Sequence, residues 1–146
     1  MVSIREKRPD DLNALRTIFL QTRLKTYTWL NTTYYKLTDF DDQAKDERIL
    51  VAVFEGCVIG FISLWMEDNF IHHLYVDGKY QHQNAGSELL NAAIVLLKFP
   101  IRLKCLEKNV KAAEFYQRRG FCNCGTGLSE DGLYMILELS QDPILK

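Results

Sequence analysis

The chain has 146 residues, of which 47% are hydrophobic and 25% are charged. This length favours a single domain covering residues 1–146, and the apolar content is too high for a disordered chain. The net charge of −1 argues against binding nucleic acid through its phosphates, and no apolar run reaches the length of a membrane span. The N-terminal sequence MVSIREKRPDD lacks the apolar core of a secretion signal, so a cytoplasmic protein is expected.

The sequence contains four cysteines, Cys57, Cys105, Cys122 and Cys124. A chain of this length needs no disulfides for stability, and thiols stay reduced in the cytoplasm. Cys57 and Cys105 lie in apolar runs, where buried free cysteine is common. Cys122 and Cys124 have the spacing C-x-C, which differs from the C-x-x-C spacing of zinc and redox sites. Free thiols are therefore predicted.

The N-terminal part predicts a short strand and a long helix. Residues 2–6 alternate between apolar and polar side chains, which is typical of a strand. Pro9 suits the first turn of a helix, and Asp10 and Asp11 favour its positive N-terminal end. Apolar residues then recur at helical spacing, so the helix is expected to extend to about Thr26.

Residues 27–47 carry aromatic and acidic side chains without clear periodicity. A short helix is expected within residues 38–45. Two interpretations stay open, a mobile helical arm with a solvated acidic face, or an aromatic and acidic lip over a substrate pocket. The lip would suit a cationic ligand, and its candidate substrate-binding residues are Tyr27, Trp29 and Tyr34.

The middle of the chain changes to short apolar runs separated by turn residues. Glu55-Gly56 marks a hairpin turn. A pattern of leucine and alanine predicts a helix from about residue 84 to 98, and a second helix starts at Asn109 and is capped by Gly120. Strands are expected at residues 49–54, 57–66, 70–76, 101–106, 121–126 and 133–139.

These elements predict a mixed α/β (α+β) fold. The first strands are joined by short turns and should be antiparallel. Two later strand–helix units should then place neighbouring strands parallel, because such crossovers are right-handed and cover one face of the sheet. A sheet of this kind offers a crevice at the carboxyl ends of its parallel strands.

The turn at residues 81–86, QHQNAG, joins a predicted strand to a predicted helix. The first amides of a helix have no partners within it, and the helix dipole adds positive potential, so the turn is suited to bind a phosphate. Gly86 would let a ligand approach the backbone. Asn84 can adopt a left-handed conformation that most residues resist.

A second motif follows in the helix from Asn109, which carries Ala112, Ala113, Phe115 and Tyr116 and ends in Gly120-Phe121. Together the two motifs resemble the GNAT superfamily of acetyl-CoA-dependent N-acetyltransferases. The family's pyrophosphate turn is matched from Gln81 to Gly86, and its later Asn…Ala…Phe-Tyr…Gly-Phe motif by the second helix. The resemblance implies a mostly antiparallel, twisted sheet of about six to seven strands flanked by about four helices.

The resemblance also implies how acetyl-CoA would be held. Backbone groups of the strand before the turn would contact the pantetheine arm, and amides 82–87 would cradle the pyrophosphate. Asn84 stands where the family usually has glycine, so a non-catalytic acyl-CoA-binding regulatory module stays open as an alternative. The implied cofactor-binding residues are Leu74, Tyr75, Val76, Gln81, His82, Gln83, Asn84, Ala85, Gly86, Ser87, Asn109, Ala112, Phe115 and Tyr116.

The resemblance implies direct attack of a primary amine on the thioester in a ternary complex. Tyr116 is the implied proton donor to the leaving thiolate. His72 and His73 are the candidate bases, and the resemblance favours His72. Neighbouring residues of a strand point to opposite faces, so only one of the two should face the cleft. For the same reason, a zinc site made of His72, His73 and His82 is not expected, and no metal is predicted.

The acceptor is expected to be a small cationic or aromatic amine or a peptide amine. No nucleic-acid or membrane partner is expected. Members of the family often form homodimers, although the sequence identifies no dimer surface.

Overall fold

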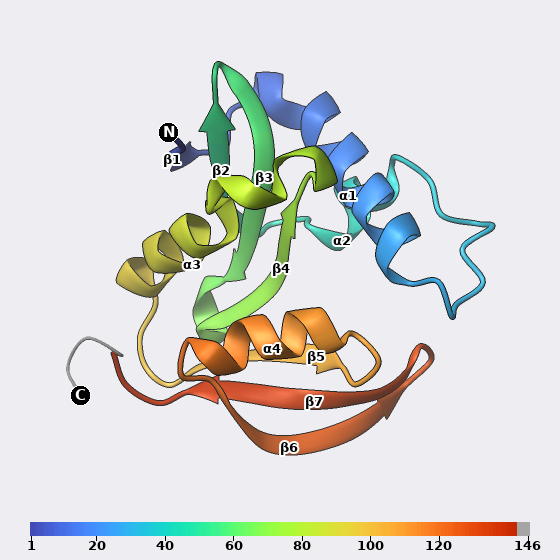
Figure 1. Ribbon diagram of the computed structural model, residues 1–146, viewed down its shortest axis with the longest axis vertical. Helices are drawn as coiled ribbons and strands as arrows, with labels where there is room; N and C mark the ends of the chain where they lie inside the picture. Colours follow the sequence, from blue (N-terminus) through green and yellow to red (C-terminus); the bar gives the residue numbers. More distant parts are fainter. Residues whose placement is uncertain (143–146) are drawn as a thin grey trace.

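The computed structural model describes residues 1–142 (Figure 1). Most of the predicted elements are confirmed within two residues of their expected ends. The strands are β1 (Ser3–Glu6), β2 (Arg48–Phe54), β3 (Cys57–Trp65), β4 (Phe70–Val76), β5 (Ile101–Leu106), β6 (Cys122–Ser129) and β7 (Gly132–Leu139). The α-helices are α1 (Leu12–Thr26), α2 (Asp39–Gln43), α3 (Ala85–Leu96) and α4 (Val110–Arg118), and the 3-10 helices are η1 (Pro9–Asp11), η2 (Met66–Asp68) and η3 (Gly78–Gln83).

The seven strands of the described residues form one sheet in the order β1-β2-β3-β4-β5-β7-β6. Neighbouring strands are antiparallel except β4 and β5, which are parallel and joined by α3. The expectation of a second parallel neighbour was wrong, because β7 lies between β5 and β6. The reason is apolar content: β7 buries Leu137 and Leu139, whereas no residue of β6 is fully buried. The more apolar strand of the hairpin therefore occupies the inner position.

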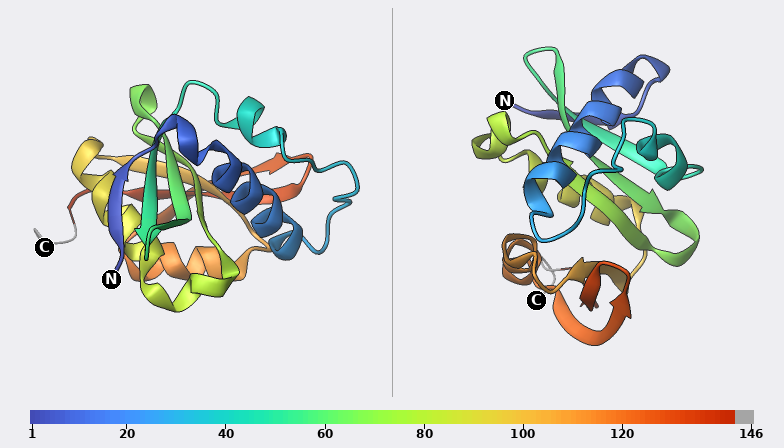
Figure 2. Two further views of the ribbon diagram at one scale, coloured as in Figure 1. Left: turned by 90° about the horizontal axis from the view of Figure 1, so that it is seen from above. Right: turned by 90° about the vertical axis from the view of Figure 1, so that its right-hand side faces the viewer.

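Helices cover both faces of the sheet (Figure 2). On one face, α3 packs over β2, β3 and β4, and its buried leucines join the larger hydrophobic cluster. On the other face, Phe19 of α1 and Phe40 of α2 pack on Phe61 of β3. These two clusters fix α1 and α3 on opposite sides of β4, the strand that leads into the predicted phosphate turn.

The four cysteines are free, as expected. Cys105 is buried beneath α4, and burial raises the pKa of its thiol to about 11. Cys57, in contrast to the expectation from its apolar run, is exposed at the start of β3. It follows directly on the tight Glu55-Gly56 turn, where both residues have positive φ, so its side chain lies at the end of the hairpin rather than in the core.

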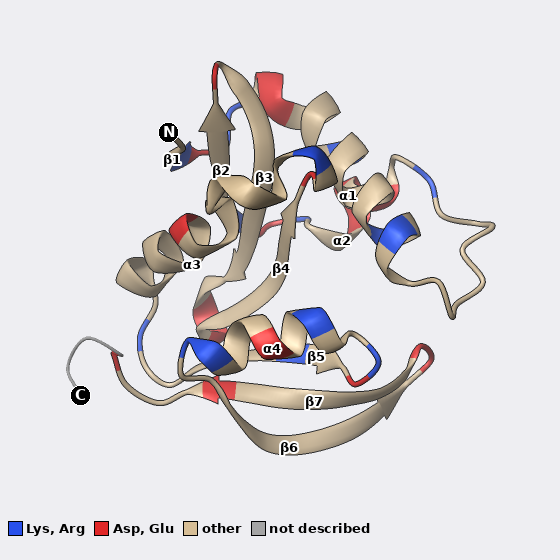
Figure 3. Ribbon diagram, viewed as in Figure 1, with Lys and Arg blue, Asp and Glu red and all other residues tan. Residues whose placement is uncertain are grey.

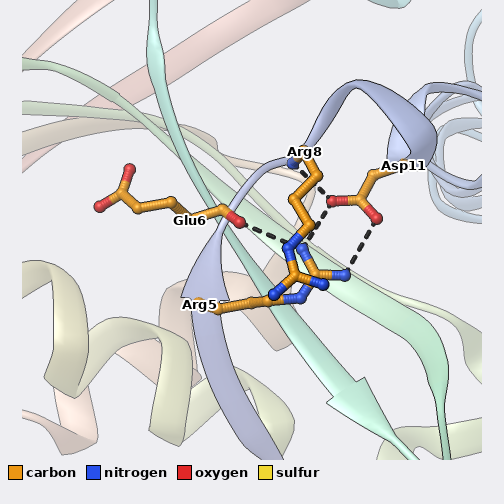
Figure 4. Close-up of polar contacts among 4 residues, drawn as sticks. All are labelled: Arg5, Glu6, Arg8 and Asp11. Carbon is orange, nitrogen blue, oxygen red and sulfur yellow. Dashed lines mark hydrogen bonds and ion pairs between the residues drawn. The ribbon is translucent and has the colours of Figure 1, made fainter.

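Asp11 connects β1 to the start of α1 (Figure 4). Its carboxylate accepts two hydrogen bonds from the Arg5 guanidinium, at 2.8 and 3.1 Å, and one from the backbone N–H of Arg8 at 2.8 Å. Its side chain is only 7% exposed. The hydrogen bonds from Arg5 lower the pKa of Asp11, so folding favours the ionised carboxylate.

We expect Asp11→Ala to lower the free energy of unfolding by about 1–3 kcal/mol, because it leaves the backbone N–H of Arg8 without its acceptor and Arg5 without its partner. Asp11 stabilises the fold above its unfolded pKa of about 4, and this contribution is lost as the pH falls below that value. Urea unfolding at neutral pH and at about pH 3 measures both effects. Asp10→Ala, at the exposed neighbour, is the matched control, and an equal loss in both variants would contradict the assignment.

Candidate active site

The strands β4 and β5 separate soon after they meet (Figure 1). Their parallel pairing is limited to Phe70 with Arg102 and Ile71 with Leu103. Asp77 donates its N–H to Ile59 of β3. Since alternate residues of a strand bond to the same neighbour, the backbone groups of Leu74 and Val76 point away from β3, towards the opening beside β5.

A groove of about 960 Å³ occupies this opening. Its walls come from the end of α1, the second half of β4, η3, the start of α3, and α4 with the residues before it. Most of the predicted cofactor-binding residues lie in these walls, whereas Ala85, the first residue of α3, is buried in the core and Gln83 is exposed outside the walls. The predicted residues in the walls are Leu74, Tyr75, Val76, Gln81, His82, Asn84, Gly86, Ser87, Asn109, Ala112, Phe115 and Tyr116.

Asn84 adopts the predicted left-handed conformation, with φ 64° and ψ 17°. It ends η3 and is the N-cap of α3, so the free amides of the first turn of α3 face the groove from this point. The Gln81 side chain donates to the Val76 carbonyl at 2.8 Å and closes the turn. Gly86 packs against Phe115, whose ring lies 3.4 Å from the position a Cβ would take. Asparagine therefore accommodates the turn where the family usually has glycine.

Four cations in the groove walls were not identified from the sequence, namely Lys25, Lys108, Lys111 and Arg119. Basic segments lie on η3 and on both ends of α4, around the opening (Figure 3). Arg119 stacks on the Phe115 ring at 3.7 Å and donates to Ser87 Oγ at the start of α3. The contact between Arg119 and Phe115 could have been predicted from the sequence, because residues four apart on a helix lie on the same face. The lysines come from separate segments that only the fold brings together.

The second motif positions Tyr116. Asn109 caps α4 by accepting from the backbone N–H of Ala112 at 3.4 Å, and Gly120, with φ 97°, follows its end. Tyr116 is only 8% exposed and lines the groove. Burial raises its pKa well above the usual value for a phenol, so the hydroxyl holds its proton.

Aromatic side chains lie at the end of the groove nearest α1. Trp29 and Tyr75 contribute to its walls. Tyr27 packs edge-on against Trp29, and its hydroxyl lies 3.3 Å from that of Tyr75. Tyr34 lies outside the walls and is 83% exposed.

Two acids of the segment 27–47 are paired with α1. Asp39 bonds to Arg23, and Asp41 bonds to Arg16. Phe40, between them, is buried in the core. Ion pairs and burial thus attach α2 to α1, so these two carboxylates are not presented to a cationic ligand.

His72 and His73 lie on the same face of the sheet, and the expectation that they diverge was wrong. Ser63 pairs with His73 and Leu64 with Ile71, so His72 is an extra residue in β4. Such a bulge interrupts the alternation of side chains. The two rings stack at 3.9 Å between centroids. They lie outside the groove walls, whereas His82 lies in them.

Glu47, which was not identified as a site residue from the sequence, lies next to His72 and His73. Its side chain is 4% exposed and its Oε2 bonds to Nδ1 of His72. His73 is 8% exposed, and its Nδ1 lies 2.9 Å from Ser63 Oγ. Burial, with smaller effects of His72 and Arg23, lowers the pKa of His73 well below its usual value, so its imidazole is neutral at physiological pH.

Within residues 1–142, the helices are too short or too polar to span a membrane. No curated protein sequence matches this chain significantly. Solved structures match closely in fold. The apo form of YjaB from Escherichia coli has 22% identity and a TM-score of 0.78, and the match covers 95% of this chain and 97% of that one.

Two further structures cover nearly the whole chain. PaiA N-acetyltransferase from Thermoplasma acidophilum, in complex with coenzyme A, has 22% identity and a TM-score of 0.75 over 97% of this chain and 99% of that one. A ribosomal-protein-alanine N-acetyltransferase from Brucella melitensis has 21% identity and a TM-score of 0.73, and the match covers 95% of this chain and 99% of that one. At these identities the similarity establishes the fold.

The family itself is identified from the sequence match. Residues 12–121 match the model of the acetyltransferase (GNAT) family. The matched range includes β4 with its opening, the left-handed turn before α3 and the motif on α4. The chain therefore belongs to the GNAT acetyltransferase family.

Proposed function

We propose that this protein is an N-acetyltransferase that moves the acetyl group of acetyl-CoA to a primary amine, without a covalent enzyme intermediate. The observation that carries the proposal is the groove between β4 and α4. It combines free strand backbone, a helix N-terminus behind a left-handed turn, and four cations. This combination suits a ligand with a polar amide arm and a pyrophosphate.

The two ends of the cofactor would be held by different chemistry. The first-turn amides of α3 would bind the pyrophosphate, and Arg119 would neutralise part of its charge. The backbone groups of Leu74 and the N–H of Val76, whose carbonyl already accepts from Gln81, would bond to the amides of the pantetheine arm as an added strand does. In this direction the thioester would lie near Tyr116, between the splayed strands.

The reaction needs two proton movements. The neutral amine nitrogen attacks the thioester carbon and gives up one proton to the base as the amide forms, while the C–S bond breaks and the thiolate leaves. Tyr116 is proposed to donate its proton towards the departing sulfur. The backbone N–H at Leu74 or Val76 would stabilise the oxyanion, and one such donor is worth about 10²–10³ in rate.

The base is proposed to be His72, with His73 as the second candidate. Glu47 orients the His72 imidazole, as the carboxylate does in other acid–histidine pairs. His72 lies outside the groove walls, so it would accept the amine proton through water. Its side chain is 41% exposed, which leaves it open to that water.

The acceptor would reach the thioester past Tyr27, Trp29 and Tyr75. Because Asp39 and Asp41 are paired with arginines of α1, we place more weight on the aromatic wall than on acidic recognition. A small amine with an aromatic or apolar part is favoured, and the α-amine of a peptide, the kind of acceptor indicated by the name of the Brucella relative, comes next.

The test is acetyl transfer by the purified protein, followed as release of the CoA thiol and as product mass. The panel comprises aromatic amines, small cationic amines and peptides. Stabilisation by acetyl-CoA together with amine-dependent thiol release supports the proposal. Stabilisation without thiol release for any amine would instead support a non-catalytic acyl-CoA-binding module, and the absence of both would refute the cofactor assignment.

A further inference from the structure

Glu47, His72 and His73 form a compact histidine–glutamate cluster beside the groove. One ligand-type atom from each residue lies within 4.8 Å of the other two. Glu47 contributes a carboxylate whose Oε1 is buried and is the one buried side-chain oxygen or nitrogen without a hydrogen-bond partner in residues 1–142. This oxygen lies 3.9 Å from Nδ1 of His73. A buried carboxylate oxygen without a hydrogen-bond partner costs folding free energy, and a bound ion would remove that cost.

The cluster exists because of the bulge in β4. In a regular strand, His72 and His73 would point to opposite faces, and two imidazoles could not reach one carboxylate. The bulge places both rings on the face covered by α1 and α2, stacked at 3.9 Å. Bulges recur next to functional sites, where they redirect a side chain.

We propose that Glu47, His72 and His73 bind a divalent first-row transition-metal ion such as Zn²⁺. Two imidazoles and one carboxylate are a common three-ligand set for zinc, with a further position open to water. Zinc–ligand distances of about 2.0–2.2 Å imply ligand atoms about 3.4 Å apart in a tetrahedral site. The candidate ligand atoms lie within 4.8 Å of one another, so they would have to move closer together when an ion binds.

The surroundings of the cluster suit an ion. Ser63 Oγ, 2.9 Å from Nδ1 of His73, and the Phe19 ring, 4.9 Å from the His73 ring, fix the inner imidazole. Partners of this kind hold a ligand in orientation. The nearby Arg23 has its charge balanced by Asp39 at 3.2 Å. His72, at 41% exposure, provides a path from solvent.

Metal binding does not depend on the acetyl-transfer proposal. A bound ion would, however, affect acetyl transfer. An imidazole nitrogen that binds a metal ion cannot accept a proton. If His72 is the base, as proposed above, the bound ion inhibits acetyl transfer, and a chelator restores it.

The test is titration of the full chain with Co²⁺ and Zn²⁺ in the absence of acetyl-CoA. The exposed thiols are first removed by Cys57→Ser, Cys122→Ser and Cys124→Ser, so that they cannot bind the ions. We expect one equivalent of Co²⁺ to give the visible absorption of a low-coordinate site without a thiolate band, and calorimetry to give one Zn²⁺ per chain. His72→Asn, at an exposed position, and Glu47→Gln should each weaken binding by more than about 100-fold, beyond the loss from removing an outer partner.

His82→Asn is the matched control, because His82 lies in the groove and outside the cluster, and it should leave metal affinity unchanged. No binding, or equal binding by the His72→Asn and Glu47→Gln variants, would overturn the site. Acetyl transfer is assayed separately with chelator present, so the failure of one proposal is not mistaken for the failure of the other.

Discussion

Gly86→Glu is expected to abolish the stabilisation of the protein by acetyl-CoA. Acetyl-CoA at 100 times its Kd should raise the free energy of unfolding of the unchanged protein by about 2.7 kcal/mol. Gly86 lines the groove within the first turn of α3. A carboxylate there would occupy the space proposed for the pyrophosphate and repel its charge. The melting temperature with increasing acetyl-CoA measures the effect.

Gly86→Gln is the matched control, because glutamine has the size of glutamate without its charge. Charge repulsion predicts an intermediate loss of affinity for glutamine and a complete loss for glutamate. Gly86→Ala adds a Cβ only 3.4 Å from the Phe115 ring, which is ordinary contact, so this variant should fold and bind. Full stabilisation of the glutamate variant by acetyl-CoA would place the pyrophosphate elsewhere.

Tyr116→Phe is expected to lower kcat by about 10²–10⁴, the usual contribution of a general acid. Burial raises the pKa of Tyr116, so the phenol stays protonated at physiological pH and is available as a donor to the forming thiolate. The substitution keeps the ring that packs on Phe121. Acetyl-CoA affinity and melting temperature should therefore change little. Steady-state kinetics with the best amine of the panel measures the effect.

Two further measurements separate donation from packing. Tyr134→Phe, on β7 outside the groove walls, is the control and should leave kcat unchanged. A thioester with a more acidic leaving thiol needs less protonation, so it should recover much of the lost rate in the Tyr116→Phe variant. An unchanged kcat for Tyr116→Phe would assign Tyr116 to packing alone.

Local patterns determined most of the elements of this protein. The hairpin turn at Gly56, the left-handed Asn84 and the cap at Gly120 all depend on backbone preferences of single residues, which can be recognised in a sequence. The spacing of apolar residues predicted the helices and strands, because each kind of element repeats its buried side chains with its own period. The two motifs between Gln81 and Phe121 were sufficient to indicate the family.

Only the tertiary structure decided which segments meet. The position of β7 between β5 and β6 depends on which strand of a hairpin buries more apolar surface against a third strand. The extra residue at His72 is visible only in the register with β3, and it reverses the expected direction of one histidine. Glu47 reaches that histidine from a distant segment. Such contacts depend on pairing and packing between distant residues, and no local preference of the chain encodes them.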